Sequence, residues 1–322
     1  LPIFSSPGKK DGLYWPTAAG EPDSPLGETV AAATEQGYKI GAGRIPFHGY
    51  YYKVLTRQGS SALGGAVDYV VGGNMIGGFA LVGSRYGIPD IGLAAFGEIS
   101  AGVRDIVSAT RLPVLIDGDT GYGDVKNVTH TIEGYEALGA SAIFIEDQVA
   151  PKRCGHMAGK DVIPADDMVT KIKAAAAARR SKDLFLIART DARAVHGLDE
   201  ALRRGEKYLA AGADGIFIEA PRSIDELKRI GKEFDVPQIC NPLMGGHTPI
   251  LSMDELGELG FNCAVLGLDT VMHAAKAIET VLLDMKSGKF ARRNDGMDFE
   301  DYKKVVGYDK WESVDERFAP RS

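Results

Sequence analysis

Short apolar runs, each ending in a polar residue, alternate with alanine-rich helical stretches from residue 87 onward. The runs are 113–120, 142–148, 184–190, 215–220, 238–242 and 263–269. Strands of this kind, apolar on both faces, are typical of a parallel sheet covered by helices. The carboxyl ends of such strands meet at one edge. We therefore expect the polar residues that end these runs to gather there.

Three connections repeat the same order of helix end, glycine and strand, with the glycine at positions 139, 212 and 260. Glycine just past a helix end adopts the left-handed conformation that terminates the helix. Serial strand–helix units with right-handed crossovers form either a barrel or a doubly wound sheet. No GxGxxG sequence opens a helix after a first strand, and polar residues end nearly every strand. Both facts favour an α/β fold of the TIM-type (β/α)8 barrel class.

The first part of the chain is rich in Gly, Pro, Ser and Tyr and lacks this regularity. The first two barrel strands are therefore atypical, and Asp68–Val71 and Phe79–Val82 are the runs that could supply them. If they do, the barrel closes, whereas otherwise an open edge exposes unpaired backbone. We expect an irregular N-terminal segment at 1–83, a catalytic barrel domain at 84–285 and a C-terminal helical extension at 286–322.

Charge and cysteine content limit the possible partners. The net charge of -7 argues against a nucleic-acid-binding surface, and no uncharged apolar run is long enough to span a membrane. Three widely spaced cysteines indicate neither a disulfide framework nor a zinc site. With no basic-then-apolar leader visible, we expect a reducing, cytoplasmic compartment.

Several carboxylates lie at the ends of the predicted strands. Asp117 and Asp119 are two residues apart, Glu146 ends the next run and Glu219 ends a later one. Carboxylates on one rim repel each other unless a cation lies among them, and Mg²⁺ prefers such oxygen ligands. The alternative is that they are ordinary helix caps and ion pairs of barrel loops.

A single cysteine lies among basic residues directly after the Glu146 strand, in the sequence KRCGH at 152–156. Neighbouring cations and a histidine predict a depressed thiol pKa for Cys154. Gly155 gives this loop the freedom to close over a substrate. A buried structural cysteine is the alternative, and it is the interpretation we adopt for Cys240 and Cys263.

Arg189 lies at the end of the apolar run 184–190. Its guanidinium suits either a substrate carboxylate or an ion pair with a rim glutamate. Both roles are compatible. Asn241, His247 and Thr248 belong to the polar loop NPLMGGHTP, which could bind a second acid group of a substrate. For His247, a solvated loop position is the alternative.

Taken together, these sequences resemble the isocitrate lyase/phosphoenolpyruvate mutase superfamily over about residues 84–315. The matching segments are PDIGL (89–93), DGDTGYG (117–123), IEDQ (145–148), KRCGH (152–156), ARTDA (188–192) and FIEA (217–220). KRCGH is the most specific, and members that carry it are mostly carbon–carbon lyases. The chain looks like the branch of 2-methylisocitrate lyase, dimethylmalate lyase and the oxaloacetate hydrolase/petal death protein group. Residues 1–83 instead resemble an uncharacterised bacterial family whose members are often exported.

The resemblance also implies roles for individual residues. Mg²⁺, with Mn²⁺ as the alternative ion, would be held directly by Asp117 and through waters by Asp90, Asp119 and Glu146. Cys154 would exchange a proton with the carbanion formed from the substrate. The loop and the substrate would be positioned by Lys152, Gly155, His156, Arg189, Glu219, Asn241 and Thr248. The superfamily's Ser-Gly-Gly loop, which grips a substrate carboxylate, falls on Gly77, Gly78 and Phe79, so the serine hydroxyl is absent.

The resemblance implies a Mg²⁺-dependent lyase that cleaves a 2-hydroxy di- or tricarboxylate of the 2-methylisocitrate or alkylmalate type. The products are a keto acid and a second carboxylate. A hydrolase that converts oxaloacetate to oxalate and acetate is the nearest alternative, and a phosphonopyruvate-type reaction is third. The chain could also be a catalytically impaired fusion that only binds a small acid. A homotetramer, with the last helix packed on a neighbouring subunit, is the assembly implied.

Overall fold

The computed structural model describes residues 75–110 and 112–319 in full. Before residue 75 it describes only the backbone of short strand segments. These are β1 (Tyr38–Lys39), β2 (Tyr51–Tyr52), β3 (Thr56–Arg57), β4 (Gly59–Ser60), β5 (Ala66–Val67) and the start of β6 (Gly73–Ile76). The run Asp68–Val71, which we considered as a barrel strand, lies outside the described residues.

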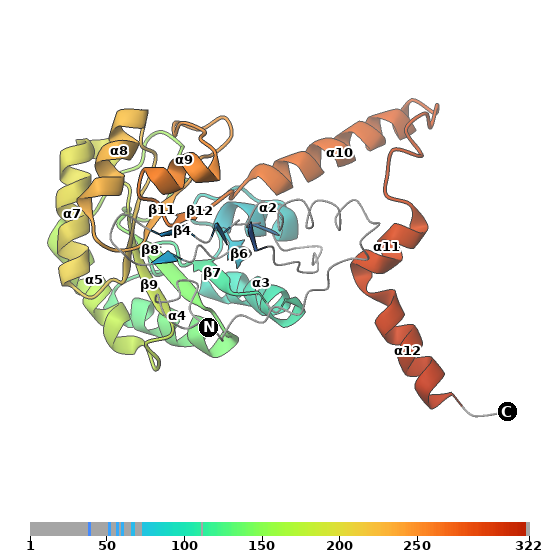
Figure 1. The fold of residues 1–322 in the computed structure, drawn as a ribbon, viewed down its shortest axis with the longest axis horizontal. Coiled ribbons are helices and arrows are strands. Elements are labelled where there is room, and N and C mark those ends of the chain that lie inside the picture. The colour runs from blue at the N-terminus through green and yellow to red at the C-terminus, as the bar shows by residue number, and fades with distance from the viewer. Residues whose placement is uncertain are drawn as a thin grey trace.

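A curled, mostly parallel sheet forms the centre of the molecule (Figure 1). Its strand order is β12-β11-β10-β9-β8-β7-β6-β2, and only β2 is antiparallel to its neighbour. After β6 the strands are β7 (Val114–Asp117), β8 (Ala142–Glu146), β9 (Phe185–Thr190), β10 (Gly215–Ile218), β11 (Gln238–Cys240) and β12 (Cys263–Ala264). The predicted α/β class and all six predicted strands are confirmed. Within the described residues the sheet ends at β12 and β2, so it forms an open, barrel-like curl.

The prediction that Phe79–Val82 forms a strand is wrong. This run lies inside α2 (Gly78–Tyr86), where Ala80, Leu81 and Val82 are buried. A short apolar run does not distinguish a buried strand from one turn of a buried helix, because both place every residue against other elements. The first parallel strand is β6, immediately before, and it pairs with β7. Ser84, near the expected domain boundary, lies within α2.

Helices cover the outer face of the sheet (Figure 1). After α2 they are α3 (Phe96–Ala109), α4 (Val125–Leu138), α5 (Ala165–Ala178), α6 (Ala192–His196), α7 (Leu198–Ala210), α8 (Ile224–Glu233) and α9 (Met253–Glu258). The glycines that follow α4, α7 and α9, Gly139, Gly212 and Gly260, all have positive φ angles. The predicted order of helix, glycine and strand is therefore confirmed.

Two layers of apolar side chains alternate along the strands. One layer faces the helices, and the other fills the inside of the curl with Leu115, Phe144, Ile187, Phe217 and Ile239. Because side chains alternate with a period of two residues, the next inward positions lie at the carboxyl ends of the same strands. Those positions are Asp117, Glu146, Arg189, Glu219 and Asn241. The strand pattern thus places five polar side chains on one rim.

Three helices follow the sheet and extend away from it (Figure 1): α10 (Asp269–Lys286), α11 (Phe299–Val306) and α12 (Tyr308–Phe318). None of their residues is buried except at the short turn between α11 and α12. Ile278 and Leu282 of α10 expose more than half of their surface. Among the described residues, no helix has the length and apolarity needed to cross a membrane.

Candidate active site

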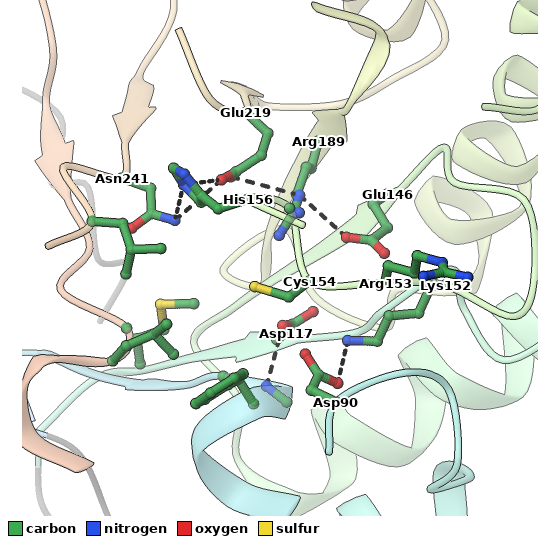
Figure 2. Close-up of a pocket in the computed structure, with 18 residues that line it drawn as sticks. Asp90, Asp117, Glu146, Lys152, Arg153, Cys154, His156, Arg189, Glu219 and Asn241 are labelled. Atoms are coloured by element: carbon green, nitrogen blue, oxygen red, sulfur yellow. Dashed lines mark hydrogen bonds and ion pairs between the residues drawn. The ribbon is translucent and has the colours of Figure 1, made fainter. Parts of the chain in front are cut away.

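A cavity of about 470 Å³, counting the part open to solvent, lies at the carboxyl ends of the strands (Figure 2). It is lined by most of the predicted site residues, namely Gly77, Gly78, Asp90, Asp117, Glu146, Lys152, Cys154, Gly155, His156, Arg189, Glu219 and Asn241. Sequence reasoning missed Met75, Leu243 and Leu268, which form the apolar part of the wall together with Phe79. The cavity therefore combines charged, polar and apolar groups, as small-molecule sites do.

One end of the cavity holds a cluster of acidic side chains around an ammonium group. Lys152 Nζ lies 2.5 Å from Asp90 and 2.6 Å from Asp119. The neighbouring Asp117 accepts hydrogen bonds from the backbone N–H groups of Gly78, at 3.2 Å, and Asp119, at 3.0 Å. The N-terminus of α2 therefore points at a carboxylate, as the helix dipole favours. Lys152, which we expected to act in the catalytic loop beside Cys154, has its ammonium group in the acidic cluster.

The acidic charge of the rim exceeds its basic charge. Three side-chain cations, Lys152, Lys160 and Arg189, lie among Asp90, Asp117, Asp119, Glu146, Asp191 and Glu219. Burial raises the pKa of Asp119 to about 7, with Asp117 and Asp90 adding to the rise and Lys152 opposing it. Burial also raises the pKa of Glu146 well above its usual range, and Arg189 opposes that rise. A further cation would relieve this excess of negative charge.

The carboxylate oxygens of the rim are hard ligands of the kind that Mg²⁺ prefers, although they do not enclose a metal ion on their own. Among the described residues, no group of three or more His, Cys, Asp or Glu side chains is arranged to hold a metal ion. Mg²⁺ does not require such a group, because it is commonly bound by one or two carboxylates together with waters. Glu146 Oε1 is buried and has no hydrogen-bond partner. The residues therefore fit an ion of this kind.

Arg189 lies at the centre of the other end of the cavity. Its Nε is 3.1 Å from Glu146, 3.0 Å from Asp191 and 3.8 Å from Glu219. Below the guanidinium lie the rings of Phe144 and Phe217, whose centroids are 5.9 and 5.3 Å away. These cation–π contacts and ion pairs fix the guanidinium in one place. Arg189 makes the ion pair that we predicted as one of its two roles, and it also lines the cavity.

Cys154 is carried by residues 150–160, which we call the flap. The base of the flap is a β-bridge between Gln148 and Val162, and the Gln148 side-chain amide both accepts from and donates to the Arg153 backbone. Figure 2 shows the Cys154 thiol between Asp117 and Arg189.

The predicted depression of the Cys154 pKa is wrong. Burial raises the pKa of the Cys154 thiol, and the opposing effects of the His156 backbone N–H and Arg189 are smaller. The thiol is therefore protonated at neutral pH.

His156 connects the flap to the opposite wall. Its Nδ1 accepts the backbone N–H of His247 at 3.1 Å, so the ring proton must lie on Nε2, which donates to Glu219 Oε1 at 2.7 Å. Asn241 Nδ2 also donates to Glu219, at 3.2 Å. Burial would raise the pKa of Glu219, but Arg189 and His156 outweigh it and lower that pKa. Glu219 is therefore an ionised, fully oriented acceptor.

Two predicted loop residues lie behind this wall. Thr248 is buried and His247 is exposed, and neither lines the cavity. Instead, His247 contributes its backbone N–H and a stacked ring contact to His156, at 6.0 Å between the ring centroids. The polar loop thus fixes a flap residue.

A buried acidic residue in IEDQ also supports the site. Asp147 accepts hydrogen bonds from Thr190, Arg204, Tyr208 and the backbone N–H of Asp191, all at 2.7–2.9 Å. It thereby joins β9 to α7. Sequence reasoning did not assign it this role, although the alternation of side chains along a strand places Asp147 on the opposite side from Glu146.

Comparison with known proteins identifies the family. The family described as Phosphoenolpyruvate phosphomutase matches residues 75–286, and a family described as Protein of unknown function (DUF2950) matches residues 2–97. The chain belongs to the PEP mutase/isocitrate lyase superfamily. Both predicted resemblances are confirmed, and the two matches overlap around α2.

Members of this superfamily similar to the chain differ in their named reactions. Carboxyvinyl-carboxyphosphonate phosphorylmutase of Arabidopsis thaliana is 37% identical over 84% of this chain and 84% of its own. The 2,3-dimethylmalate lyase of Eubacterium barkeri is 38% identical over 75% of this chain and 84% of its own. The family alone therefore does not determine the reaction.

Two solved structures show the same fold. Oxaloacetate acetylhydrolase with the inhibitor 3,3-difluorooxalacetate superposes with a TM-score of 0.73 at 29% identity, over 78% of this chain and 86% of that one. Phosphonopyruvate hydrolase in complex with oxalate and Mg²⁺ gives a TM-score of 0.67 at 28% identity, over 76% of this chain and 86% of that one. The barrel-like architecture is shared across these reactions.

Proposed function

We propose that this protein is a Mg²⁺-dependent carbon–carbon lyase that cleaves a 2-hydroxy di- or tricarboxylate of the 2-methylisocitrate or alkylmalate type. The observation that carries the proposal is the position of the Cys154 thiol, which lies in the cavity between an acidic cluster and an oriented arginine, where burial raises its pKa. A buried acid beside a carboxylate-binding group suits protonation of a carbanion next to a carboxylate. Named lyases among the relatives support the same assignment.

Cleavage requires a proton to leave one carbon's hydroxyl and another to reach the adjacent carbon. As the C2–C3 bond breaks, its electron pair moves to C3, and the C2 hydroxyl becomes a carbonyl by losing its proton. Glu146 suits the role of proton acceptor, because its Oε1 is buried without a hydrogen-bond partner and the residue lines the cavity. Cys154 Sγ then donates its proton to C3, which completes the second carboxylic acid.

The remaining residues hold the substrate. Arg189, already fixed by its ion pairs, binds the carboxylate that receives the developing charge. Asn241 and Glu219, joined by a hydrogen bond, face the same cavity and orient polar groups of the substrate. Gly77 and Gly78 at the α2 N-terminus line the cavity without the serine hydroxyl, and the positive end of the helix dipole favours an anionic group there.

Asp117 is the residue that would hold Mg²⁺ directly, with Asp90, Asp119 and Glu146 acting through waters, and Mn²⁺ would suit the same oxygen donors. When bound, the ion would supply Lewis-acid stabilisation to the substrate oxygens. The excess of carboxylates over cations at the rim supports this assignment.

A second candidate is the hydrolysis of oxaloacetate to oxalate and acetate. It is favoured by the structural similarity to oxaloacetate acetylhydrolase. A phosphonopyruvate-type reaction is less favoured, because KRCGH resembles the loop of the carbon–carbon lyase members.

A substrate panel with a metal-binding control tests these alternatives. With Mg²⁺, we expect keto acid from 2-methylisocitrate or 2,3-dimethylmalate, measured as its hydrazone. We also expect oxalate with Mg²⁺ to raise the melting temperature, and Asp117→Ala to abolish both effects. Asp225→Ala removes an exposed carboxylate that does not line the cavity and should change neither.

Each of the other outcomes would indicate a different function for this protein. Oxalate formed from oxaloacetate alone would select the hydrolase, and phosphate formed from phosphonopyruvate alone would select the third reaction. Stabilisation by oxalate without any turnover would indicate an impaired fusion that only binds a small acid.

We propose further that the protein assembles as a homotetramer through α10. Ile278 and Leu282 lie one helical turn apart on α10 and are 57% and 58% exposed. An exposed apolar stripe of this kind is typical of an interface. Light scattering after gel filtration should give four times the chain mass, and Ile278→Asp with Leu282→Asp should reduce it. A monomeric wild type would contradict the proposal.

A further inference from the structure

A lysine at the far end of the flap is buried although its loop is at the surface. The Lys160 side chain is 4% exposed, and its ammonium donates to Asp191 Oδ1 at 2.7 Å and to the backbone carbonyl of Gly155. Burying an ammonium group is unfavourable unless it is paired and hydrogen-bonded. These two contacts therefore determine where the Lys160 side chain lies.

The two partners of Lys160 belong to different parts of the site. Gly155 follows Cys154 in the flap, whereas Asp191 follows β9 and is bonded through its backbone N–H to Asp147, at 2.9 Å. The other Asp191 oxygen accepts from Arg189 Nε at 3.0 Å. One fixed carboxylate therefore joins the lysine of the flap to the arginine of the cavity.

The charges around Asp191 make this junction strong. Burial would raise the pKa of Asp191, but Arg189 and Lys160 outweigh burial and lower it to about 2. Asp191 is thus ionised at neutral pH, and charge-assisted hydrogen bonds are about twice as strong as neutral ones.

The turn at Cys154–Gly155 is also packed tightly against the rim. A Cβ atom added to Gly155 would lie 2.6 Å from Glu219 Cγ and would also overlap the Arg189 guanidinium. Such a close approach of backbone to side chains is possible only for glycine. A displacement of the turn by the width of a methyl group would therefore move the Cys154 thiol out of its position.

We propose that Lys160 is a positioning residue, which holds the Cys154–Gly155 turn against the rim through Asp191. Lys160 does not line the cavity, so it has no contact with the substrate. It acts on the reaction only by holding the thiol in place. The inference rests on the proposed role of Cys154 as proton donor, but the closed position of the flap can be measured without turnover.

The test compares Lys160→Met, which keeps the length but not the charge, with Lys160→Arg, which keeps both donors and the charge. The rate of Cys154 alkylation by iodoacetamide is followed by mass spectrometry of the Cys154 peptide, so that Cys240 and Cys263 do not contribute. Loss of a charge-assisted bond should accelerate alkylation in Lys160→Met about 10- to 100-fold and lower kcat by a similar factor. Lys160→Arg should keep the slow alkylation and most of the kcat of the wild type. In Lys160→Met, KM should change less than kcat.

Equal alkylation rates in wild type and Lys160→Met would overturn the proposal. So would equal losses in the Met and Arg variants together with lower melting temperatures, since these would indicate a merely structural role. If no substrate of the panel is turned over, the alkylation rates still decide the inference, and only the proposed function fails.

Discussion

Replacing Cys154 with alanine should lower kcat about 100- to 10,000-fold, the usual contribution of a general acid. Burial raises the pKa of this thiol, so the thiol keeps the proton that it delivers to the carbanion. KM should change little, because Arg189, Asn241 and Glu219 still hold the substrate. The measurement is steady-state kinetics with the substrate that the panel identifies.

Cys154→Ser is the matched control for this prediction. Serine keeps the size and a hydrogen-bond donor but is a much weaker acid, so kcat should remain low. The melting-temperature increase with oxalate and Mg²⁺ should persist in both variants. Turnover by Cys154→Ala within tenfold of wild type would mean that the proton comes from another group.

Replacing Arg189 with methionine should destabilise the protein by about 3–5 kcal/mol, because buried charges lose their partner. Glu146 and Asp191 are both buried and lie within 3.1 Å of Arg189 Nε. The variant should also lose binding of the substrate carboxylate. Urea unfolding followed by circular dichroism measures the first effect, and the melting-temperature shift with oxalate measures the second.

The destabilisation should depend on pH in a definite direction. Because Arg189 helps to lower the pKa of Asp191 in the folded state, the stability it contributes is present above the ordinary aspartate pKa. It is lost as pH falls toward about 2, where Asp191 becomes protonated. The difference in the free energy of unfolding between wild type and Arg189→Met should therefore shrink on acidification.

Arg189→Lys keeps the charge and should be less destabilised, although it lacks the two-pronged geometry of the guanidinium. A pH-independent difference would argue against the ion pairs as the cause.

The strand pattern determined more of this protein than any single motif did. Runs that are apolar on both faces predicted the parallel sheet, and glycines 139, 212 and 260 predicted where helices end. The positions of Asp117, Glu146 and Arg189 at the ends of these runs predicted that they lie on the same rim, and all three line the cavity. These features depend on local backbone geometry, so the sequence alone carries them.

Tertiary structure decided the features that depend on burial and on distant partners. Phe79–Val82 is helical because α2 packs as a whole, and a four-residue run does not show this. The cations adjacent to Cys154 in sequence predicted a depressed pKa, but burial of the thiol dominates and raises it. Lys152 pairs with Asp90, and Lys160 with Asp191, across long stretches of chain. Desolvation and long-range ion pairing act only after the chain has folded, so no local pattern reveals them.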